Sequence, residues 1–373
     1  MPRTRRESLA FTVVVTVLVV LGALLMLAIL ALSGAPAITL LATCLAALPV
    51  GPLIATYLWL DRYEPEPKRL LAYGLLWGAF VATVAAIVIG GVGGYVAGFS
   101  ENVSLAIVAP VTEEASKGFF LLLLLWWRRA ELDGILDGIV YAGMVGIGFA
   151  FTENILYLTA AYNGTDSTGP GGLAGVTGTF VVRCVFSPFA HPLFTAFLGI
   201  GVGLAVTSRS RGFRVLAIIG GYLLAVTAHG LWNGSTIFGF GSFALVYLVL
   251  MAPALVGLFC LAIWAQRSEA RMLTAALTDA AQRGLVPATD IGWVVDLRAR
   301  RAARQYAAQY GGPAGAQAMR DYQQAAVELG FLHNRILRGT APKDWQARGQ
   351  EFVVRIGEVR PHIAFPGQVV PVR

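Results

Sequence analysis

Charged residues are scarce in this sequence. Asp, Glu, Lys and Arg make up 13% of its 373 residues, whereas hydrophobic residues make up 57%. Soluble domains contain roughly a quarter charged residues. The shortage of charge therefore excludes an ordinary soluble domain and indicates a polytopic membrane protein.

Cysteine and histidine are also scarce. Cys44, Cys184 and Cys260 lie far apart in apolar runs, and there is no C-x-x-C pair. This pattern excludes a disulfide framework and argues against a thiolate zinc site. Four histidines are present but no H-E-x-x-H motif, and two of them, His333 and His362, lack metal-ligand spacing.

Lys and Arg are missing from every second connection between apolar segments. The stretches "SGAPA", "GFSEN", "YNGTDSTGPGG" and "NGSTIFGFGS" contain neither, and they alternate with basic or charged stretches such as "DRYEPEPKR" and "TSRSRGFR". The positive-inside rule then places both termini in the cytoplasm. We expect a multi-pass, all-α bundle in the cell membrane, whose first apolar window is a retained span. The eight predicted spans are 9–32, 38–60, 70–97, 104–127, 135–160, 179–206, 214–236 and 243–265.

The composition changes near residue 266, so we predict a transmembrane domain over 1–266 and a basic helical tail over 267–373. The tail contains 15 Lys/Arg and 9 Asp/Glu, which accounts for most of the net charge of +7. Its segments look like amphipathic helices separated by breaks such as "GGPAG". We interpret it as a small cytoplasmic module that performs no chemistry and contacts partners or an anionic lipid surface rather than nucleic acid.

Several ionisable residues fall inside predicted spans, where a charge is costly and is functional by default. Because Glu113 and Glu114 precede Lys117 by four and three residues, all three lie on one side of a helix. A self-neutralising ion pair is the simplest interpretation, but it leaves one carboxylate in excess. The remaining polar candidates in the spans are Glu153, Arg183, His191 and His229, with Asn233 one helical turn after His229.

These groups have similar depths in the predicted topology. Counted from the outer ends of their spans, Glu114 and His191 lie about ten to thirteen residues in, and Glu153 and His229 about seven. One shared site between mid-membrane and the outer leaflet is therefore geometrically possible. The span with Glu153 also carries small residues every four positions, at Ala142, Gly146 and Ala150, which predicts a central, closely packed helix.

The ordered motifs "EEASK", "FAFTE" and "HGLWN", preceded by "DRYEPEP", resemble the PrsW family of bacterial intramembrane proteases over about residues 50–240. That family is related to the type II prenyl-protein endopeptidases. The resemblance implies regulated intramembrane proteolysis, in which a membrane-anchored protein such as an anti-sigma factor is cut near its extracytoplasmic side.

The resemblance also implies roles for single residues. One of Glu113 and Glu114 would activate water, Glu153 belongs to the second motif with Phe149, and Lys117 supports the glutamate pair. Two alternatives remain open for the rest. His191, His229 and a glutamate such as Glu153 would bind zinc, or a metal-free site would use His229 and Asn233 to stabilise the oxyanion.

The sequence also leaves open a function of a different class from a protease. A proton-coupled transporter or channel would also need a buried Glu/His relay. No inverted repeat of spans is visible, which disfavours many transporter folds. A non-catalytic scaffold would leave the clustered charges unexplained.

Overall fold

The computed structural model describes residues 9–32, 36–164, 170–342 and 344–367. Every regular element in these ranges is helical, so the predicted all-α class is confirmed. The described residues form two compact units. The membrane bundle contains those up to Ile263 except Arg62–Glu64, and the tail unit contains Arg62–Glu64 and those from Trp264 onward.

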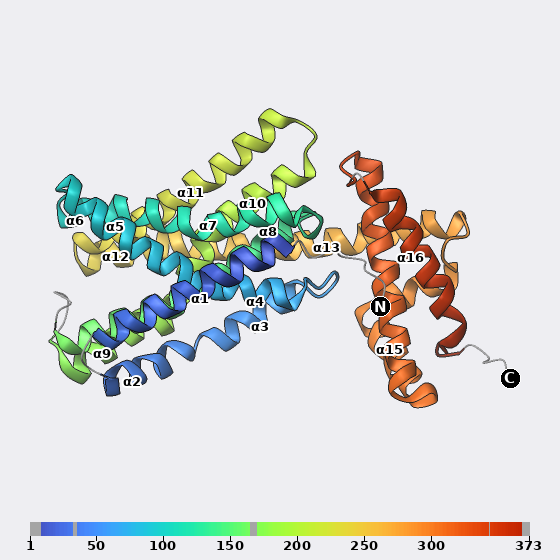
Figure 1. Cartoon of the computed structure of the whole chain (residues 1–373), viewed down its shortest axis with the longest axis horizontal. Helices are drawn as coiled ribbons and strands as arrows, with labels where there is room; N and C mark the ends of the chain where they lie inside the picture. Colours follow the sequence, from blue (N-terminus) through green and yellow to red (C-terminus); the bar gives the residue numbers. More distant parts are fainter. Residues whose placement is uncertain (1–8, 33–35, 165–169, 343, 368–373) are drawn as a thin grey trace. The chain divides into compact units, whose positions relative to one another are not determined.

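The membrane bundle is built mainly from long helices (Figure 1). These helices are apolar, and four of them are interrupted by π-helical turns. Turns of this kind widen a helix locally and are frequent at functional sites. The helices are α1 (Leu9–Leu32), α2 (Pro36–Ala47), α3 (Val50–Leu60), α4 (Lys68–Leu76), α5 (Thr83–Ala97), α6 (Glu101–Val103), α7 (Ala109–Trp127), α8 (Ile135–Asn163), α9 (Gly172–Phe180), α10 (Ala190–Thr207), α11 (Arg211–Ile237), α12 (Phe240–Val246) and α13 (Ala252–Gln282). The π-helical turns are η1 (Trp77–Ala82), η2 (Ser104–Val108), η4 (Val181–Phe186) and η5 (Tyr247–Met251).

Seven helices or joined helices of the described residues are long and apolar enough to cross a membrane. They correspond to seven of the eight predicted windows. The remaining window, 104–127, also forms a continuous helical run from η2 into α7. Every 18-residue stretch of that run contains Glu113, Glu114 and Lys117, so its composition is less apolar than that of the others. An eighth span at α7 stays a prediction.

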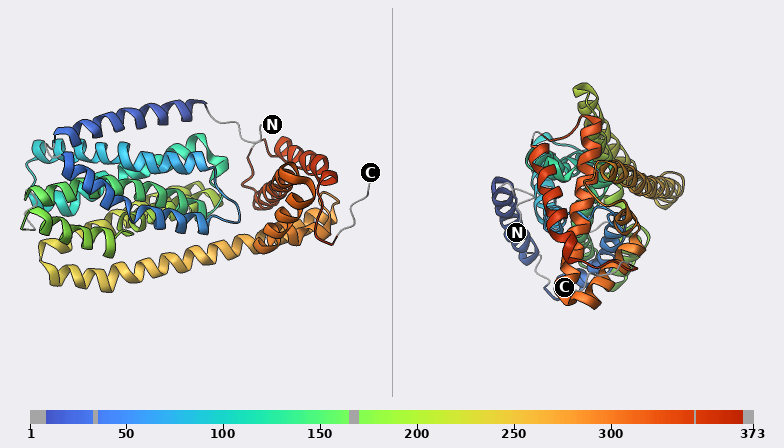
Figure 2. Two further views of the ribbon diagram at one scale, coloured as in Figure 1. Left: turned by 90° about the horizontal axis from the view of Figure 1, so that it is seen from below. Right: turned by 90° about the vertical axis from the view of Figure 1, so that its right-hand side faces the viewer.

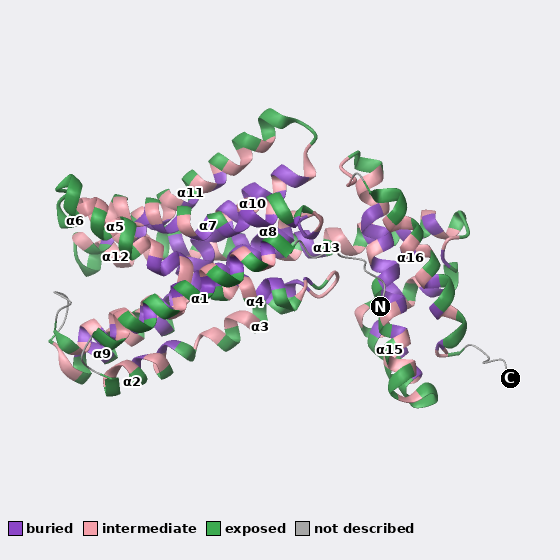
Figure 3. Ribbon diagram, in the orientation of Figure 1, coloured by how far each residue is buried: buried purple, intermediate pink, exposed green. Residues whose placement is uncertain are grey.

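The outer helices present apolar side chains to their surroundings, as lipid contact requires. Only 22% of the most apolar window of α1 is buried, and the value is 17% for the joined α12 and α13. Figure 2 shows α1 along the edge of the bundle, and Figure 3 shows exposed positions along α11. In contrast, 89% of the corresponding window of α8 is buried. Helix α8 is therefore central, in agreement with its small residues.

Glycines allow α8 to approach its neighbours closely. A Cβ atom on Gly148 would lie 1.9 Å from the carbonyl oxygen of Leu75 in α4, and one on Gly78 in η1 would lie 1.9 Å from that of Val145 in α8. A Cβ on Gly146 would lie 2.6 Å from the backbone nitrogen of Pro192 in α10. These contacts hold α8 directly against α4, η1 and α10, and α10 contributes His191 to the polar cluster described below.

We therefore expect Gly148→Ala to destabilise the bundle by about 1–3 kcal/mol or more, because backbone must move to admit the methyl group. Thermal unfolding of the purified protein in detergent measures the effect. Gly91→Ala is the matched control, since a Cβ at Gly91 in α5 meets nothing within 4 Å. That control should be neutral or slightly stabilising. Equal stability of the two variants would contradict the close packing of α8.

The loop motif "DRYEPEP" has a structural explanation. The backbone N–H of Glu66 donates to Asp61 Oδ2 (2.7 Å), and the hydroxyl of Tyr141 in α8 donates to Glu66 Oε2 (2.6 Å). All three residues are buried. The acidic groups of this motif thus fix the loop between α3 and α4 to the central helix, away from the polar cluster.

The tail unit is helical and has its own hydrophobic core, with Tyr322 and Phe365 at its centre. The predicted break at "GGPAG" is present, since Gly312 has φ 59° and interrupts the run of α15 before Pro313. Within the predicted helical tail, α16 buries Phe352 and Ile356 in the core. The helices of this unit, in addition to the end of α13, are η6 (Ala288–Asp290), α14 (Ile291–Val295), α15 (Leu297–Arg338), α16 (Trp345–Val359) and η7 (Arg360–His362).

Candidate active site

Three charged side chains of α7 point into the bundle. Glu114 and Lys117 are completely buried, and Glu113 is 8% exposed. The ammonium Nζ of Lys117 lies 3.3 Å from Glu113 Oε2 and 2.7 Å from Glu114 Oε1. The predicted ion pair on one helical face is therefore present, but one lysine faces two carboxylates and further polar groups surround it.

His191 on α10 joins this cluster through both of its ring nitrogens. Nδ1 lies 3.1 Å from Nζ of Lys117, and Nε2 lies 2.7 Å from Glu153 Oε2 on α8. An ammonium group has donors only, so Nδ1 must accept and the ring proton must be on Nε2. Lys117 and Glu153 together thus fix the tautomer of His191. The lone pair on Nδ1 accepts from Lys117, and the N–H of Nε2 donates to Glu153.

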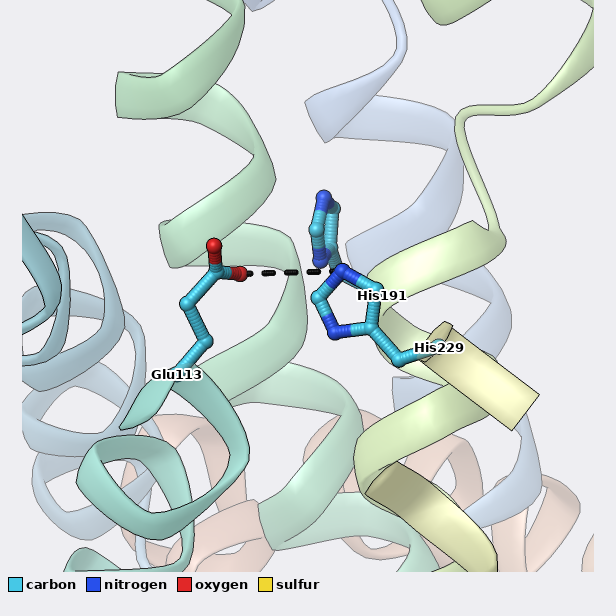
Figure 4. Close-up of side chains that lie close together, drawn as sticks. All are labelled: Glu113, His191 and His229. Atoms are coloured by element: carbon cyan, nitrogen blue, oxygen red, sulfur yellow. Dashed lines mark ion pairs between the residues drawn. The ribbon is translucent and has the colours of Figure 1, made fainter. Parts of the chain in front are cut away.

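His229 on α11 has the opposite arrangement. Its Nδ1 lies 3.0 Å from Glu114 Oε1, which as a carboxylate oxygen can only accept, so Nδ1 carries the proton. Its Nε2 therefore presents a lone pair, and this atom lies 3.8 Å from Glu113 Oε2. Figure 4 shows Glu113 and the rings of His191 and His229 facing one another across this gap.

Glu153, which accepts from His191, also forms an ion pair with Arg183 of η4. The guanidinium Nε also donates to Asn154 Oδ1 (2.8 Å), and the group stacks 3.9 Å above the ring of Tyr157. The η4 turn therefore brings Arg183 back to α8, where it balances the charge of Glu153. The cluster of three carboxylates and two cations carries one net negative charge when both histidines are neutral.

Aromatic rings enclose the polar groups. The ring of Phe149 lies 3.8 Å from Nζ of Lys117, a cation–π contact, and 5.0 Å from the ring of His191. Phe194 stacks on His229 with the ring centroids 4.8 Å apart. These rings surround the polar groups with apolar surface and pack against both imidazoles.

Two residues of the cluster were absent from the sequence prediction. Thr195 donates to Glu114 Oε2 (3.0 Å), and Phe194 covers His229. Both follow His191 on α10 at helical spacing, three and four residues later, so the periodicity of "HPLFT" was the available signal. Arg183 was recognised as an intramembrane charge, but no partner was predicted for it.

Asn233 does not contact the polar cluster directly. Its side-chain amide donates to the backbone carbonyl of Leu105 in η2 (3.1 Å), and the residue borders a cavity of about 760 Å³. His191, Arg183 and Asn154 also line this cavity, together with Ala and Gly residues of α8 and α9. The cavity thus gives a molecule of peptide size access to the edge of the cluster.

Among the described residues, one group has a ligand set suited to a metal ion: Glu113, His191 and His229, whose ligand atoms all lie within 4.8 Å of one another. Two histidines and a glutamate are a typical catalytic zinc set, and a carboxylate behind a histidine, as Glu114 is behind His229, commonly supports a ligand. The residue types therefore fit a metal. The structure groups Glu113 with the histidines, where the sequence interpretation placed Glu153.

The comparison with protein families gives a match over the part of the chain that contains α7, α8, α10 and α11. The model of the family described as PrsW family intramembrane metalloprotease matches residues 66–258, slightly more than half of the chain. This chain belongs to the PrsW family. The matched region contains every residue of the polar cluster, whereas α1 to α3 and the tail unit lie outside it.

Two curated members of the PrsW family are similar to this chain. The protease PrsW of Oceanobacillus iheyensis is 31% identical over 146 residues, which are 39% of this chain and 58% of that protein. The protease PrsW of Geobacillus kaustophilus is 27% identical over 226 residues, which are 59% of this chain and 86% of that protein. No solved structure matches the chain.

Proposed function

We propose that this member of the PrsW family is an intramembrane endopeptidase in which Glu113 activates the hydrolytic water. The observation that carries this proposal is the 3.8 Å gap between Glu113 Oε2 and His229 Nε2. Both atoms are acceptors, so a water molecule that donates to both would satisfy them. Glu113 and His229 would then orient the oxygen of this water within the buried polar cluster.

In the proposed reaction, Glu113 takes a proton from this water while the water oxygen attacks the scissile carbonyl carbon. The same carboxyl group then returns the proton to the leaving amine as the C–N bond breaks. Glu114 is too fully engaged for this role, because its oxygens already accept from Lys117, His229 and Thr195. We assign Glu114 to positioning His229.

In the alternative, metal-dependent mechanism, a metal ion held by Glu113, His191 and His229 would polarise the water or the scissile carbonyl, and it would replace the direct contacts of Glu113 and His229 with the water. Zinc is the metal that we propose for this site, because two histidines and a glutamate are typical zinc ligands. Glu153 would then act behind His191, whose Nε2–H it accepts, while Arg183 balances its charge.

The cavity beside His191 is the proposed place of the substrate's peptide bond. Asn233 has two amide N–H donors, of which one donates to Leu105, so the second is free to stabilise an oxyanion from the cavity side. The proposed substrate is a membrane-anchored protein, and the family resemblance supports an anti-sigma factor cut in the outer half of its span.

The purified chain in proteoliposomes, mixed with membrane proteins that have a single span, tests this function. New N-termini inside a span, identified by terminal labelling and mass spectrometry, are the expected result. Proton flux across the vesicle membrane without any new terminus would instead support the transporter and contradict the protease.

We also propose that both termini face the cytoplasm, which the alternation of Lys- and Arg-rich connections supports. Reporter fusions after Asn163, where α8 ends, and after Arg211, where α11 begins, should then report opposite sides of the membrane. Fusions that report the same side would overturn the topology and, with it, the outer position of the site.

A further inference from the structure

The ammonium group of Lys117 contacts two of the three candidate metal ligands, Glu113 and His191. Its three acceptors are Glu113 Oε2 (3.3 Å), Glu114 Oε1 (2.7 Å) and His191 Nδ1 (3.1 Å). Since an ammonium has three N–H donors, each of them has an acceptor here. The group is completely buried and also lies over the ring of Phe149. Lys117 is thus fully satisfied without any metal.

Two of the three candidate metal ligands are therefore already used by Lys117. The only lone pair of His191 is on Nδ1, because its Nε2–H donates to Glu153, and this lone pair accepts from Lys117. Glu113 offers Oε2 to the same ammonium. Of the two histidines, only His229 presents an unshared lone pair, at Nε2. A dication at the three ligands would lie close to a positive charge that it repels.

We propose that Lys117 is an internal cation that competes with divalent metal: the cluster binds a metal only when the ammonium of Lys117 leaves Glu113 and His191. The charge balance agrees with this. With Lys117 in place, three carboxylates face two cations, which leaves a single negative charge. Without its ammonium, the cluster carries two negative charges, which one dication neutralises.

Replacing Lys117 by a neutral side chain of similar length should therefore create a tighter metal site. We expect Lys117→Met to bind Co²⁺ at least about tenfold more tightly than the wild-type chain, since a positive charge a few ångströms away is removed. The probe is Co²⁺ alone, titrated into the full chain in detergent. Its visible absorption reports tetrahedral coordination, and competition with Zn²⁺ gives the relative affinity.

Two further variants test the cause. Lys117→Arg keeps the charge and should bind Co²⁺ no more tightly than the wild type. Lys117→Met combined with His191→Ala should lose the gain, which places the metal at the cluster rather than on the tail histidines. Circular dichroism and gel filtration check the fold, and Lys117→Gln replaces the Met variant if the latter does not fold.

The proposal is overturned if the wild-type chain binds Co²⁺ within about threefold of the affinity of the neutral variant. A folded neutral variant that binds no Co²⁺ also overturns it. One further measurement needs no variant, because the wild-type chain purified without chelator should contain much less than one zinc per chain. Full zinc occupancy with unchanged Lys117 contacts would contradict the competition. None of these readouts depends on cleavage, so this proposal and the proposed protease activity fail separately.

Discussion

Glu113→Gln is expected to reduce the rate of intramembrane cleavage by about 10²–10⁴-fold, the usual contribution of a general base. Glutamine keeps the shape of the side chain but cannot take a proton from water. Glu114→Gln should cost about 10–100-fold, as for a residue that orients an active-site histidine. The measurement is the rate at which a single-span substrate is cut by each purified variant in proteoliposomes.

The matched control is Glu101→Gln in α6, an exposed glutamate outside the cluster, which should cleave at the wild-type rate. The order of effects is the informative result. A larger loss for Glu114→Gln than for Glu113→Gln would contradict our assignment and make Glu114 the base. Equal, small losses would show that neither carboxylate transfers the proton.

His229→Ala is the second large effect that we expect, with a loss of roughly 10²–10³ in kcat, as for removal of one group that stabilises the transition state. The imidazole links the two glutamates, because Nδ1 contacts Glu114 and Nε2 faces Glu113. Its removal leaves the proposed water with a single partner and also removes the ring that stacks on Phe194.

His333→Ala is the control for His229, since His333 pairs with Asp279 in the tail unit and has no contact with the cluster. It should leave cleavage unchanged. Because His229 is buried, the folded state of His229→Ala must be checked by thermal unfolding. A folded variant that retains wild-type kcat would remove His229 from the mechanism.

The positions of the helices could be predicted largely from apolar length, because burying backbone in lipid requires helices of about 20 residues. Matching the depths of Glu114, His191, Glu153 and His229 also predicted groups that the structure brings together. Seven predicted windows correspond to apolar helices of the structure. The α7 window is less apolar because it contains Glu113, Glu114 and Lys117. Their ion pairs within the helix could be predicted from spacing, whereas their contacts with α10 and α11 could not.

Pairing between helices could not be predicted from single-helix patterns. The contact of Lys117 with Nδ1 of His191 joins α7 to α10, and it decides which imidazole lone pair is available. The expected oxyanion partner, Asn233, shares a helix face with His229, but the crossing of α11 with η2 directs its amide to Leu105. The tail could be predicted as helical, but the burial of Phe352 and Ile356 of α16 depends on contacts with the other helices of the tail unit.

The combined change of Glu113 and Glu114 to Gln tests the central claim most directly. The wild-type chain and this double variant are reconstituted separately with a single-span membrane protein, and new N-termini are quantified by mass spectrometry. We predict a cut in the outer half of the substrate's span for the wild type, and no detectable cut for a folded double variant. Cleavage by the double variant at the wild-type rate would show that the paired glutamates form a structural ion pair with Lys117 and perform no chemistry.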